Sequence, residues 1–341
     1  MILRSDFDYH LPAERIAQVP LDQRDQSRLL VLDKVTGHIS HRHFFNLVEY
    51  LEPNDVLVLN NTRVSAQRLF GSRRGHNDSV ETFLTDRVSD GLWKALVRPG
   101  RKLHPGTVIE YGDGLTAEVL ESTDVRGGRL IQFSAPSPIE DAIFSHSSAP
   151  LPPYITTPLA NDQRERYQTV YSRFEGSSAA PTAGLHFTET LLRSIMERGV
   201  QITSVTLHVG IGTFRPIETE DVHDHVMHSE HMEITDECAD VVNNASGRVV
   251  AVGTTSCRAL ESAATEKGLV RSGTQDTALF VTPGYDFKIV DALVTNFHMP
   301  RSTLMLLVSA LAGTDHIRAA YSEALEKEYR FLSFGDSMFI Q

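Results

Sequence analysis

The chain has little of what marks several large classes of protein. Its 341 residues include only two cysteines, Cys238 and Cys257, too few for a disulfide framework and not spaced as metal ligands. Its best apolar run, Leu304 to Leu311, is far shorter than a membrane span. Residues 1–9 carry two aspartates and no apolar core, unlike a signal peptide. We therefore expect a soluble, cytoplasmic protein with no membrane partner.

Positive charge is also scarce. The formal net charge of -12 argues against a protein that coats nucleic acid through bulk electrostatics. Residues 61–105 are the exception, with nine Lys and Arg against four Asp and Glu. A local basic patch on an acidic protein suits a partner with phosphates and a defined shape. On charge alone, solvated strand faces explain the same numbers equally well.

What is present is an interrupted alternation of strands and helices. Buried strands are expected at 28–33 and 56–59, and beyond residue 188 the alternation is typical of a largely parallel sheet flanked by helices. Between these parts, six short β-rich segments predict a small antiparallel barrel or sandwich. The segments lie near 66–71, 80–85, 92–97, 107–111, 115–121 and 129–134.

The fold class that follows is α/β, with a discontinuous α/β domain and an inserted small antiparallel β-barrel domain. The α/β domain comprises residues 1–60 and 150–341, and the barrel domain comprises residues 61–149. A proline-rich connector is expected over 136–158, and further strands near 277–281 and 287–294.

The most unusual motif is the stretch of small residues at 176–188, Gly-Ser-Ser-Ala-Ala-Pro-Thr-Ala-Gly-Leu-His-Phe-Thr. It leads into a helix N-terminus, a place that suits an anionic group, with His186 available to exchange a proton. A flexible loop has the same composition, so both interpretations stay open.

Two further motifs carry histidines. Residues 207–214 follow a strand and contain Gly210 and Gly212, but Arg215 replaces the third glycine of a dinucleotide fingerprint. The cluster His223-Asp-His-Val-Met-His-Ser-Glu-His231 holds metal-ligand residue types. Its spacing fits no known zinc helix, so groups for proton transfer and hydrogen bonding are the favoured interpretation over a metal.

Two more strand-to-helix turns complete the pattern. In the stretch 252–261, Thr254 to Ser256 can cap a helix and leave its N–H groups facing an anion. A cap with a purely structural role is an equal alternative. Residues 295–303 place Asn296 and His298 at the end of an apolar strand. Several turns with such side chains at one sheet edge predict an enzyme pocket.

Read in order, the motifs resemble the S-adenosylmethionine:tRNA ribosyltransferase-isomerase family of queuosine biosynthesis. The resemblance spans nearly the whole chain and rests on long, rare motifs. They include Asp6-Phe-Asp-Tyr-His-Leu-Pro12, Leu59-Asn-Asn-Thr-Arg-Val64, Val97-Arg-Pro-Gly-Arg-Lys102, Pro152-Pro-Tyr-Ile155, Arg166-Tyr-Gln-Thr-Val-Tyr171, the 176–188 loop, His208-Val-Gly-Ile-Gly-Thr-Phe214, Met227-His-Ser-Glu230, Val252-Gly-Thr-Thr255 and Thr295-Asn-Phe-His298.

The resemblance implies a transferase with S-adenosylmethionine as co-substrate and no metal. It implies transfer of a ribosyl unit to 7-aminomethyl-7-deazaguanine (preQ1) at the wobble position of tRNA. Rearrangement then gives epoxyqueuosine-tRNA and releases adenine and methionine. It also implies intertwined α/β and β-barrel domains. We expect the partners to be the anticodon arm of preQ1-modified tRNA and S-adenosylmethionine, and the protein to be a monomer.

Three sets of site residues follow as hypotheses. The catalytic candidates, with base and acid not assigned among them, are His186, His208, His228, Glu230 and His298. The candidates for holding S-adenosylmethionine are Pro181, Thr182, Gly184, Gly210, Gly212, Thr213 and Asn296. The candidates for tRNA phosphates are Arg63, Arg68, Arg98, Arg101 and Lys102.

Two rival functions stay open on the sequence. A tRNA-binding protein without chemistry would use the same basic segment and would be indifferent to S-adenosylmethionine. An ordinary methyltransferase would leave S-adenosylhomocysteine in place of adenine, and the N-terminal region lacks the glycine-rich turn expected of it.

Overall fold

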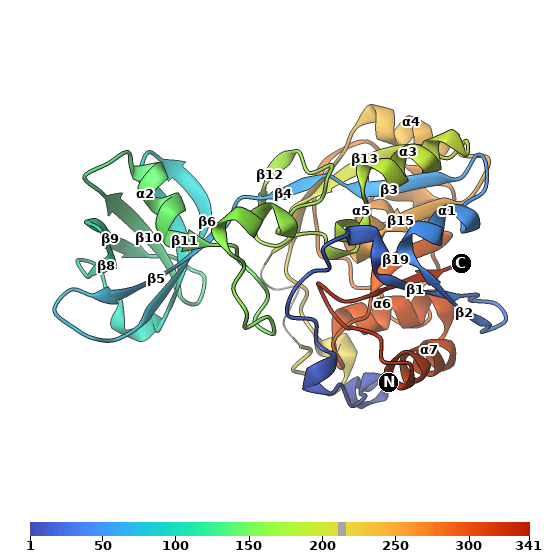
Figure 1. Ribbon diagram of the computed structural model, residues 1–341, viewed down its shortest axis with the longest axis horizontal. Coiled ribbons are helices and arrows are strands. Elements are labelled where there is room, and N and C mark those ends of the chain that lie inside the picture. The colour runs from blue at the N-terminus through green and yellow to red at the C-terminus, as the bar shows by residue number, and fades with distance from the viewer. Residues whose placement is uncertain (211–215) are drawn as a thin grey trace.

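The computed structural model describes residues 1–210 and 216–341, apart from the side chain of Asn161. A barrel of short strands lies at one end of the molecule and a larger α/β body at the other, joined by extended segments (Figure 1). Both termini belong to the α/β body. Within the described residues, no helix combines the length and apolarity needed to cross a membrane.

A nine-stranded sheet forms the centre of the α/β body. Four of its eight pairings are parallel (β13–β3, β3–β15, β15–β19 and β20–β1) and four are antiparallel. The order is β18 (Gly273–Thr277), β14 (Glu230–Ile234), β13 (Gln201–Leu207), β3 (Val56–Asn60), β15 (Val249–Val252), β19 (Ala292–Asn296), β20 (Ser337–Ile340), β1 (Arg28–Leu32) and β2 (Ile39–His43).

The prediction of a largely parallel sheet was therefore wrong, because the sheet is mixed. Only the four central strands, β13, β3, β15 and β19, form an unbroken parallel set. The short turn after β1 brings β2 back alongside it, and a connection of that length permits only an antiparallel neighbour.

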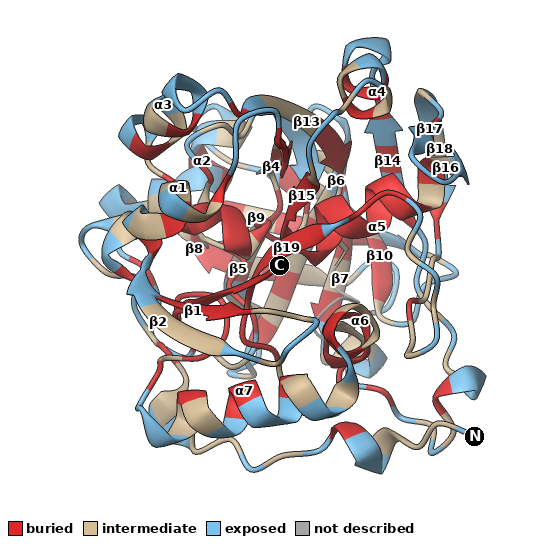
Figure 2. Ribbon diagram, turned by 90° about the vertical axis from the view of Figure 1, so that its right-hand side faces the viewer, coloured by how far each residue is buried: buried red, intermediate tan, exposed pale blue. Residues whose placement is uncertain are grey.

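Helices cover both faces of the sheet, which explains its continuous apolar strands (Figure 2). Successive side chains of a strand point to opposite faces. Val56 and Val58 thus pack in the cluster that contains α4 to α7, whereas Leu57 and Leu59 pack with α1 and α3. The helices are α1 (Leu47–Tyr50), α3 (Glu189–Glu197), α4 (Asp236–Asn243), α5 (Gly253–Ala263), α6 (Thr303–Ala312) and α7 (Thr314–Glu326).

The six expected β segments form a closed antiparallel barrel, as predicted. Hydrogen bonds between β5 and β8 close the ring, and the short β11 (Ser147–Ser148) adds to β5. Inward side chains such as Leu69, Val119 and Ile131 fill the interior. The strands are β5 (Gln67–Arg73), β6 (Val80–Ser89), β7 (Leu92–Arg98), β8 (Val108–Gly112), β9 (Leu115–Ser122) and β10 (Gly128–Ser134).

Two connections differ from expectation. The proline-rich segment contains a helix, α2 (Ile139–His146), because Ala142 and Ile143 bury against the barrel core. The strand expected at 287–294 begins only at Ala292, since the preceding N–H groups donate to the buried carboxylate of Glu261 in place of a neighbouring strand. The strand expected near 277–281 ends at Thr277 as β18.

The segment that leaves the sheet toward the barrel pairs with the segment that returns. β4 (Thr62–Val64) runs parallel to β12 (Phe174–Ser177) and has no partner among the barrel strands. The division of the chain at residues 60 and 150 into two domains stays a prediction.

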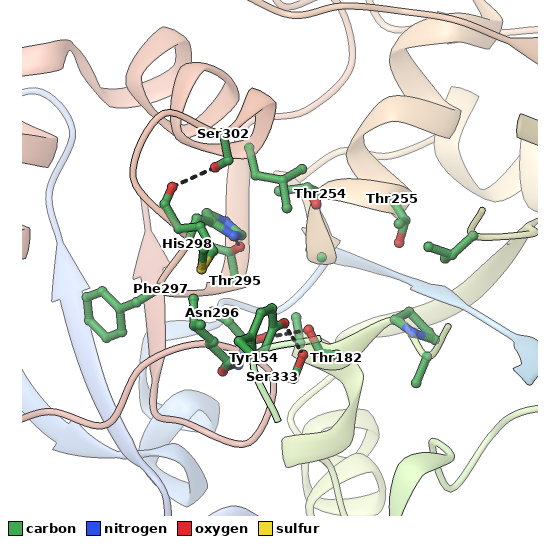
Figure 3. Close-up of a pocket in the computed structure, with 18 of the residues that line it drawn as sticks. Tyr154, Thr182, Thr254, Thr255, Thr295, Asn296, Phe297, His298, Ser302 and Ser333 are labelled. Carbon is green, nitrogen blue, oxygen red and sulfur yellow. Dashed lines mark hydrogen bonds between the residues drawn. The ribbon is translucent and has the colours of Figure 1, made fainter. Parts of the chain in front are cut away.

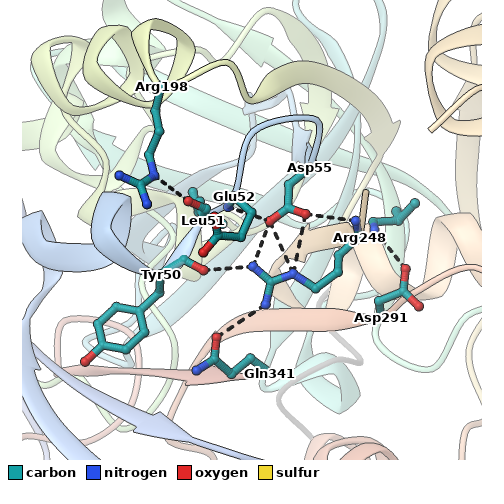
Figure 4. Close-up of polar contacts among 9 residues, drawn as sticks. Tyr50, Leu51, Glu52, Asp55, Arg198, Arg248, Asp291 and Gln341 are labelled. Carbon is teal, nitrogen blue, oxygen red and sulfur yellow. Dashed lines mark hydrogen bonds and ion pairs between the residues drawn. The ribbon is translucent and has the colours of Figure 1, made fainter. Parts of the chain in front are cut away.

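An ion pair between the buried Asp55 and the half-buried Arg248 lies at the amino ends of the central strands β3 and β15 (Figure 4). Burial acts to raise the pKa of Asp55, but hydrogen bonds from Arg248 and from backbone N–H groups outweigh it and hold that pKa below its usual value. Arg248 also donates to the carbonyl of Tyr50, 2.8 Å away. The Asp55–Arg248 ion pair joins the amino ends of β3 and β15. Because these strands are parallel, their carboxyl ends also lie side by side, at the other edge of the sheet.

Candidate active site

A cavity that opens to solvent lies at the carboxyl ends of β15 and β19, with about 720 Å³ of empty space when the solvent at its open mouth is included. Ligands of open α/β sheets bind at this edge, outside the carboxyl ends of the strands. Side chains from several separate parts of the chain meet there (Figure 3). The polar ones among the described residues are Tyr154, Thr182, Thr254, Thr255, Thr295, Asn296, His298, Ser302 and Ser333.

Asn296 is the hub of the cavity wall. It is buried at the last position of β19, where it pairs with Ser337 of β20. Its Oδ1 accepts from the Thr182 hydroxyl at 3.0 Å, and its Nδ2 donates to His186 Nε2 at 3.0 Å and to the Leu332 carbonyl at 3.2 Å. One amide thus holds the 176–188 loop against β19 and the C-terminal loop. The prediction that Thr182, Asn296 and Pro181 share a pocket is consistent with this geometry.

His186 acts behind the wall and does not line the cavity. Since its Nε2 accepts from Asn296, its Nδ1 carries the proton and donates to Ser27 Oγ at 2.7 Å. Burial, with the positive charges of Arg24 and Arg330, lowers the pKa of His186 to about 3. The ring is therefore neutral near pH 7 and positions Asn296.

His298 does line the cavity. Its Nε2 lies 2.9 Å from the Thr295 hydroxyl, and its backbone N–H donates to Tyr321. Burial lowers the pKa of His298 to about 3, so this imidazole is also neutral near pH 7. On the same wall the Tyr154 hydroxyl pairs with Ser333 at 2.7 Å, and burial raises the pKa of Tyr154 to about 12. These side chains present neutral hydrogen-bonding groups to a ligand.

The start of α5 forms another side of the cavity. Gly253, Thr254 and Thr255 line it, and the expected cap was wrong, because no side chain caps the first turn of α5. Thr255 Oγ1 accepts instead from Asn60, and Ser256 donates to the Val252 carbonyl. The backbone N–H groups at this helix start remain a donor surface for a ligand.

A second cavity adjoins the first, with about 510 Å³ of empty space when the solvent at its mouth is included, and Leu304 lines both. It contains three predicted site residues, Gly210, His228 and Glu230. The buried Glu230 carboxylate accepts from the Gly210 N–H at 3.0 Å and forms an ion pair with Arg258 of α5. The sequence reading missed Arg258, although its position four residues after Thr254 places it near the same face of that helix.

The remaining predicted residues of the α/β body lie elsewhere. His208 Nδ1 pairs with Thr62 of β4 at 2.8 Å, and burial together with neighbouring His231 lowers the pKa of His208. Gly184 lies under Tyr171, where an added Cβ would come within 2.1 Å of the phenol oxygen, so it serves packing there. Gly212 and Thr213 lie outside the described residues.

The predicted tRNA-binding residues divide into two groups. Arg63 and Arg68 are held by Glu165 and Glu81, each at 2.6 Å. Arg98 at the end of β7, with Arg101 and Lys102 in the following turn, is exposed. Within the described residues Arg98 and Arg101 make no ion pair, whereas Lys102 Nζ lies 3.8 Å from a carboxylate oxygen of Asp78. This exposed group is therefore held less firmly than Arg63 and Arg68.

The histidine cluster does not assemble as metal ligands. Among the described residues, no three His, Cys, Asp or Glu side chains come together in a way that would hold a metal ion. His225 and His228 line the second cavity instead, and His231 pairs with Asp276 on the neighbouring strand at 2.8 Å.

An α/β body with two adjoining cavities at its strand ends, and a closed β-barrel beside it, is an architecture typical of an enzyme of the α/β class. Comparison with known proteins gives the family. Residues 4–340 match the family model described as "Queuosine biosynthesis protein". A protein of Acetivibrio thermocellus named S-adenosylmethionine:tRNA ribosyltransferase-isomerase is 51% identical over 341 residues, which cover 99% of each chain.

A solved structure agrees with the sequence match. The crystal structure of S-adenosylmethionine tRNA ribosyltransferase from Thermotoga maritima is 38% identical to this chain. The two superpose with a TM-score of 0.55 over 98% of this chain and 100% of the other. The chain belongs to the family of S-adenosylmethionine:tRNA ribosyltransferase-isomerases of queuosine biosynthesis and is a transferase.

Proposed function

We propose that this chain transfers the ribosyl unit of S-adenosylmethionine to the aminomethyl nitrogen of preQ1 at the tRNA wobble position. Isomerisation of the transferred unit then yields epoxyqueuosine-tRNA, with adenine and methionine as the other products. The observation that carries the proposal is the pair of adjoining cavities at the sheet edge. The names of the relatives, which specify S-adenosylmethionine and tRNA, support the same substrates.

The first cavity suits the adenosine part of S-adenosylmethionine. Adenine and ribose are uncharged and carry several donors and acceptors, which match the amide of Asn296, the hydroxyl of Thr182 and the helix start at Thr254. Pro181 lines the same wall. We assign no metal to the site, because the polar groups among its described lining residues are neutral hydroxyl, amide and imidazole groups, without a carboxylate or a thiol.

Proton transfers fall to the residues of the two cavities. The positive sulfonium acidifies the neighbouring C5′ protons, so a positioned base removes one, and a general acid assists the departure of adenine. His298, His228 and Glu230 lie where they can contact the co-substrate. His186 supports the reaction by holding Asn296. His208, a further catalytic candidate, lies outside both cavities.

The tRNA meets the barrel side of the molecule in this proposal. Arg98, Arg101 and Lys102 contact phosphates of the anticodon arm, and Arg63 and Arg68 contribute once their carboxylate partners rearrange. We propose a cytoplasmic monomer, and light scattering of the purified protein tests the oligomeric state.

Product analysis tests the function. Purified protein is mixed with S-adenosylmethionine and preQ1-modified tRNA, and the products are separated by chromatography. We expect adenine and methionine in equal amounts, formed only with the modified tRNA. S-adenosylhomocysteine would establish a methyltransferase instead. Tight tRNA binding without turnover would establish a binding protein.

A further inference from the structure

Arg258 is a buried cation whose hydrogen bonds are incomplete. Its side chain extends from α5 into the wall of the second cavity and is 5% exposed. Nε donates to the Leu279 carbonyl at 3.1 Å, and Nη1 forms the ion pair with Glu230. Nη2 is buried and has no hydrogen-bond partner among residues 1–210 and 216–341.

A buried N–H group without a hydrogen-bond acceptor destabilises a folded protein unless another group accepts its hydrogen bond. A guanidinium carries five N–H donors in a fixed plane, and it is stable when buried only if carboxylate or carbonyl oxygens meet them. Arg258 could have been replaced by an apolar side chain if its only task were to fill space beside Leu279. An orphaned donor next to a cavity therefore points to an acceptor that arrives with a ligand.

The second cavity has the chemistry of an amino-acid site. The aliphatic and thioether side chains of Met227, Val281 and Leu307 line it, and the only charged carboxylate and guanidinium among its described lining residues are Glu230 and Arg258. A free amino-acid end carries one carboxylate and one ammonium, which complement that pair. The adenosine part offers no charge to match them.

Resting on the proposed function, we propose that Arg258 binds the carboxylate of the methionyl end of S-adenosylmethionine through Nη2. The methionyl chain lies in the second cavity, and the adenosine part lies in the first. Leu304 lies between them, because it lines both cavities. The Glu230 carboxylate, in the same wall as Arg258, faces the ammonium and sulfonium charges. Arg258 is thus a binding residue for the departing methionine.

The test compares S-adenosylmethionine with its decarboxylated analogue, in which a hydrogen replaces the carboxylate. Adenine release is measured with preQ1-modified tRNA for the full-length protein. We expect the unmodified chain to show a kcat/KM about 10- to 100-fold lower for the analogue, mostly through KM. In Arg258→Lys and Arg258→Gln, kcat/KM for S-adenosylmethionine falls by a larger factor than the value for the analogue, so the preference for the carboxylate shrinks.

A second variant avoids removing a buried charge. Thr303→Glu adds a carboxylate at a half-buried position on the wall of the second cavity, at the start of α6. It should lower kcat/KM for S-adenosylmethionine more than for the analogue, since only the former has a carboxylate to repel. Arg248→Lys serves as the matched control, because Arg248 is an ion-paired arginine of the same body that lines neither cavity.

The outcomes separate this inference from the function. If the unmodified chain releases adenine but uses both substrates equally well, the carboxylate is not recognised and the inference is overturned. The inference is also overturned if Thr303→Glu or the Arg258 variants lower kcat/KM for S-adenosylmethionine and for the analogue by the same factor, as a purely structural role predicts. Absence of adenine release from the unmodified chain contradicts the proposed function itself.

Discussion

The barrel and the α/β body use buried polar side chains in different ways. In the barrel, Thr82 pairs with Tyr111 at 2.6 Å, and Arg129 donates to the carbonyls of Leu103 and Gly128 and of a nearby turn. These bonds close within the barrel and serve its architecture.

In the α/β body, by contrast, the buried polar side chains gather at the strand ends. Asn296 and His298 present groups to the first cavity, and Arg258 leaves Nη2 unused beside the second. The difference indicates where each part functions. It supports our proposal that the chemistry takes place in the body and that the tRNA meets the outer surface of the barrel, where Arg98, Arg101 and Lys102 are exposed.

The largest expected effect comes from removing the hub of the first cavity. Asn296→Ala should lower kcat/KM for adenine release about 100-fold or more, because three segments of the wall lose their common anchor. Steady-state kinetics with preQ1-modified tRNA measure it. Asn243→Ala is the matched control, since Asn243 bonds only the backbone of Val270 away from the cavities. A change of less than about 5-fold in Asn296→Ala would remove this residue from the site.

Removing the internal anchor of the barrel should affect stability and leave co-substrate binding intact. Arg129→Met leaves three buried or half-buried carbonyls without their donor, so we expect a loss of about 2–4 kcal/mol in the free energy of unfolding. Urea denaturation measures the loss, and the KM for S-adenosylmethionine of the folded variant should be unchanged. A raised KM would mean that the barrel interior and the cavities are coupled.

Charge reversal on the barrel surface should affect the tRNA alone. With Arg98, Arg101 and Lys102 changed to Glu, tRNA affinity should fall about 10-fold or more at moderate salt, and the slope of log affinity against log salt should flatten by about 0.7 per lost phosphate contact. Fluorescence titration at several salt concentrations measures both. Reversal of the exposed Arg193, Lys267 and Arg271 on the α/β body is the control with equal charge change. Equal effects of the two triples would show a nonspecific charge response.

The smallest effect is a pH dependence that belongs to the α/β body. The pKa of His298, like that of His186, is about 3 in the folded protein because of burial, against about 6.5 in the unfolded chain. Between these values only the unfolded chain binds the proton, so stability is complete above pH 6.5 and declines as the pH falls toward 3.

Each of these histidines should lower the free energy of unfolding by about 1.5 kcal/mol as the pH falls from 6.5 to 5. Denaturation curves across this range should show a slope that His298→Gln reduces. His10→Gln, a change at an exposed histidine, is the control and should leave the slope as it is. An unchanged slope in His298→Gln would mean that the imidazole takes up its proton in the folded state.

The candidate site was partly within reach of the sequence. Asn296, His298 and Thr182 belong to strand ends and loops of a predicted sheet, and the carboxyl ends of neighbouring parallel strands meet at one edge. Arg258 was out of reach, because a buried arginine in a helix reads as an ordinary exposed one until its surroundings are known. His186 does lie in the predicted loop, but its side chain is behind the wall of the first cavity, since a sequence does not give the direction of a side chain.

The sequence by itself determined the α/β class, the barrel strands and the family. Strand and helix periodicities and local motifs depend on residues that are close together in the sequence, so they can be recognised from the sequence alone. Only the tertiary structure decided that the sheet is mixed, that Glu230 pairs with Arg258 across 28 positions, and that two cavities adjoin at Leu304. Those features depend on which distant segments pack together, and local periodicity carries no information about that choice.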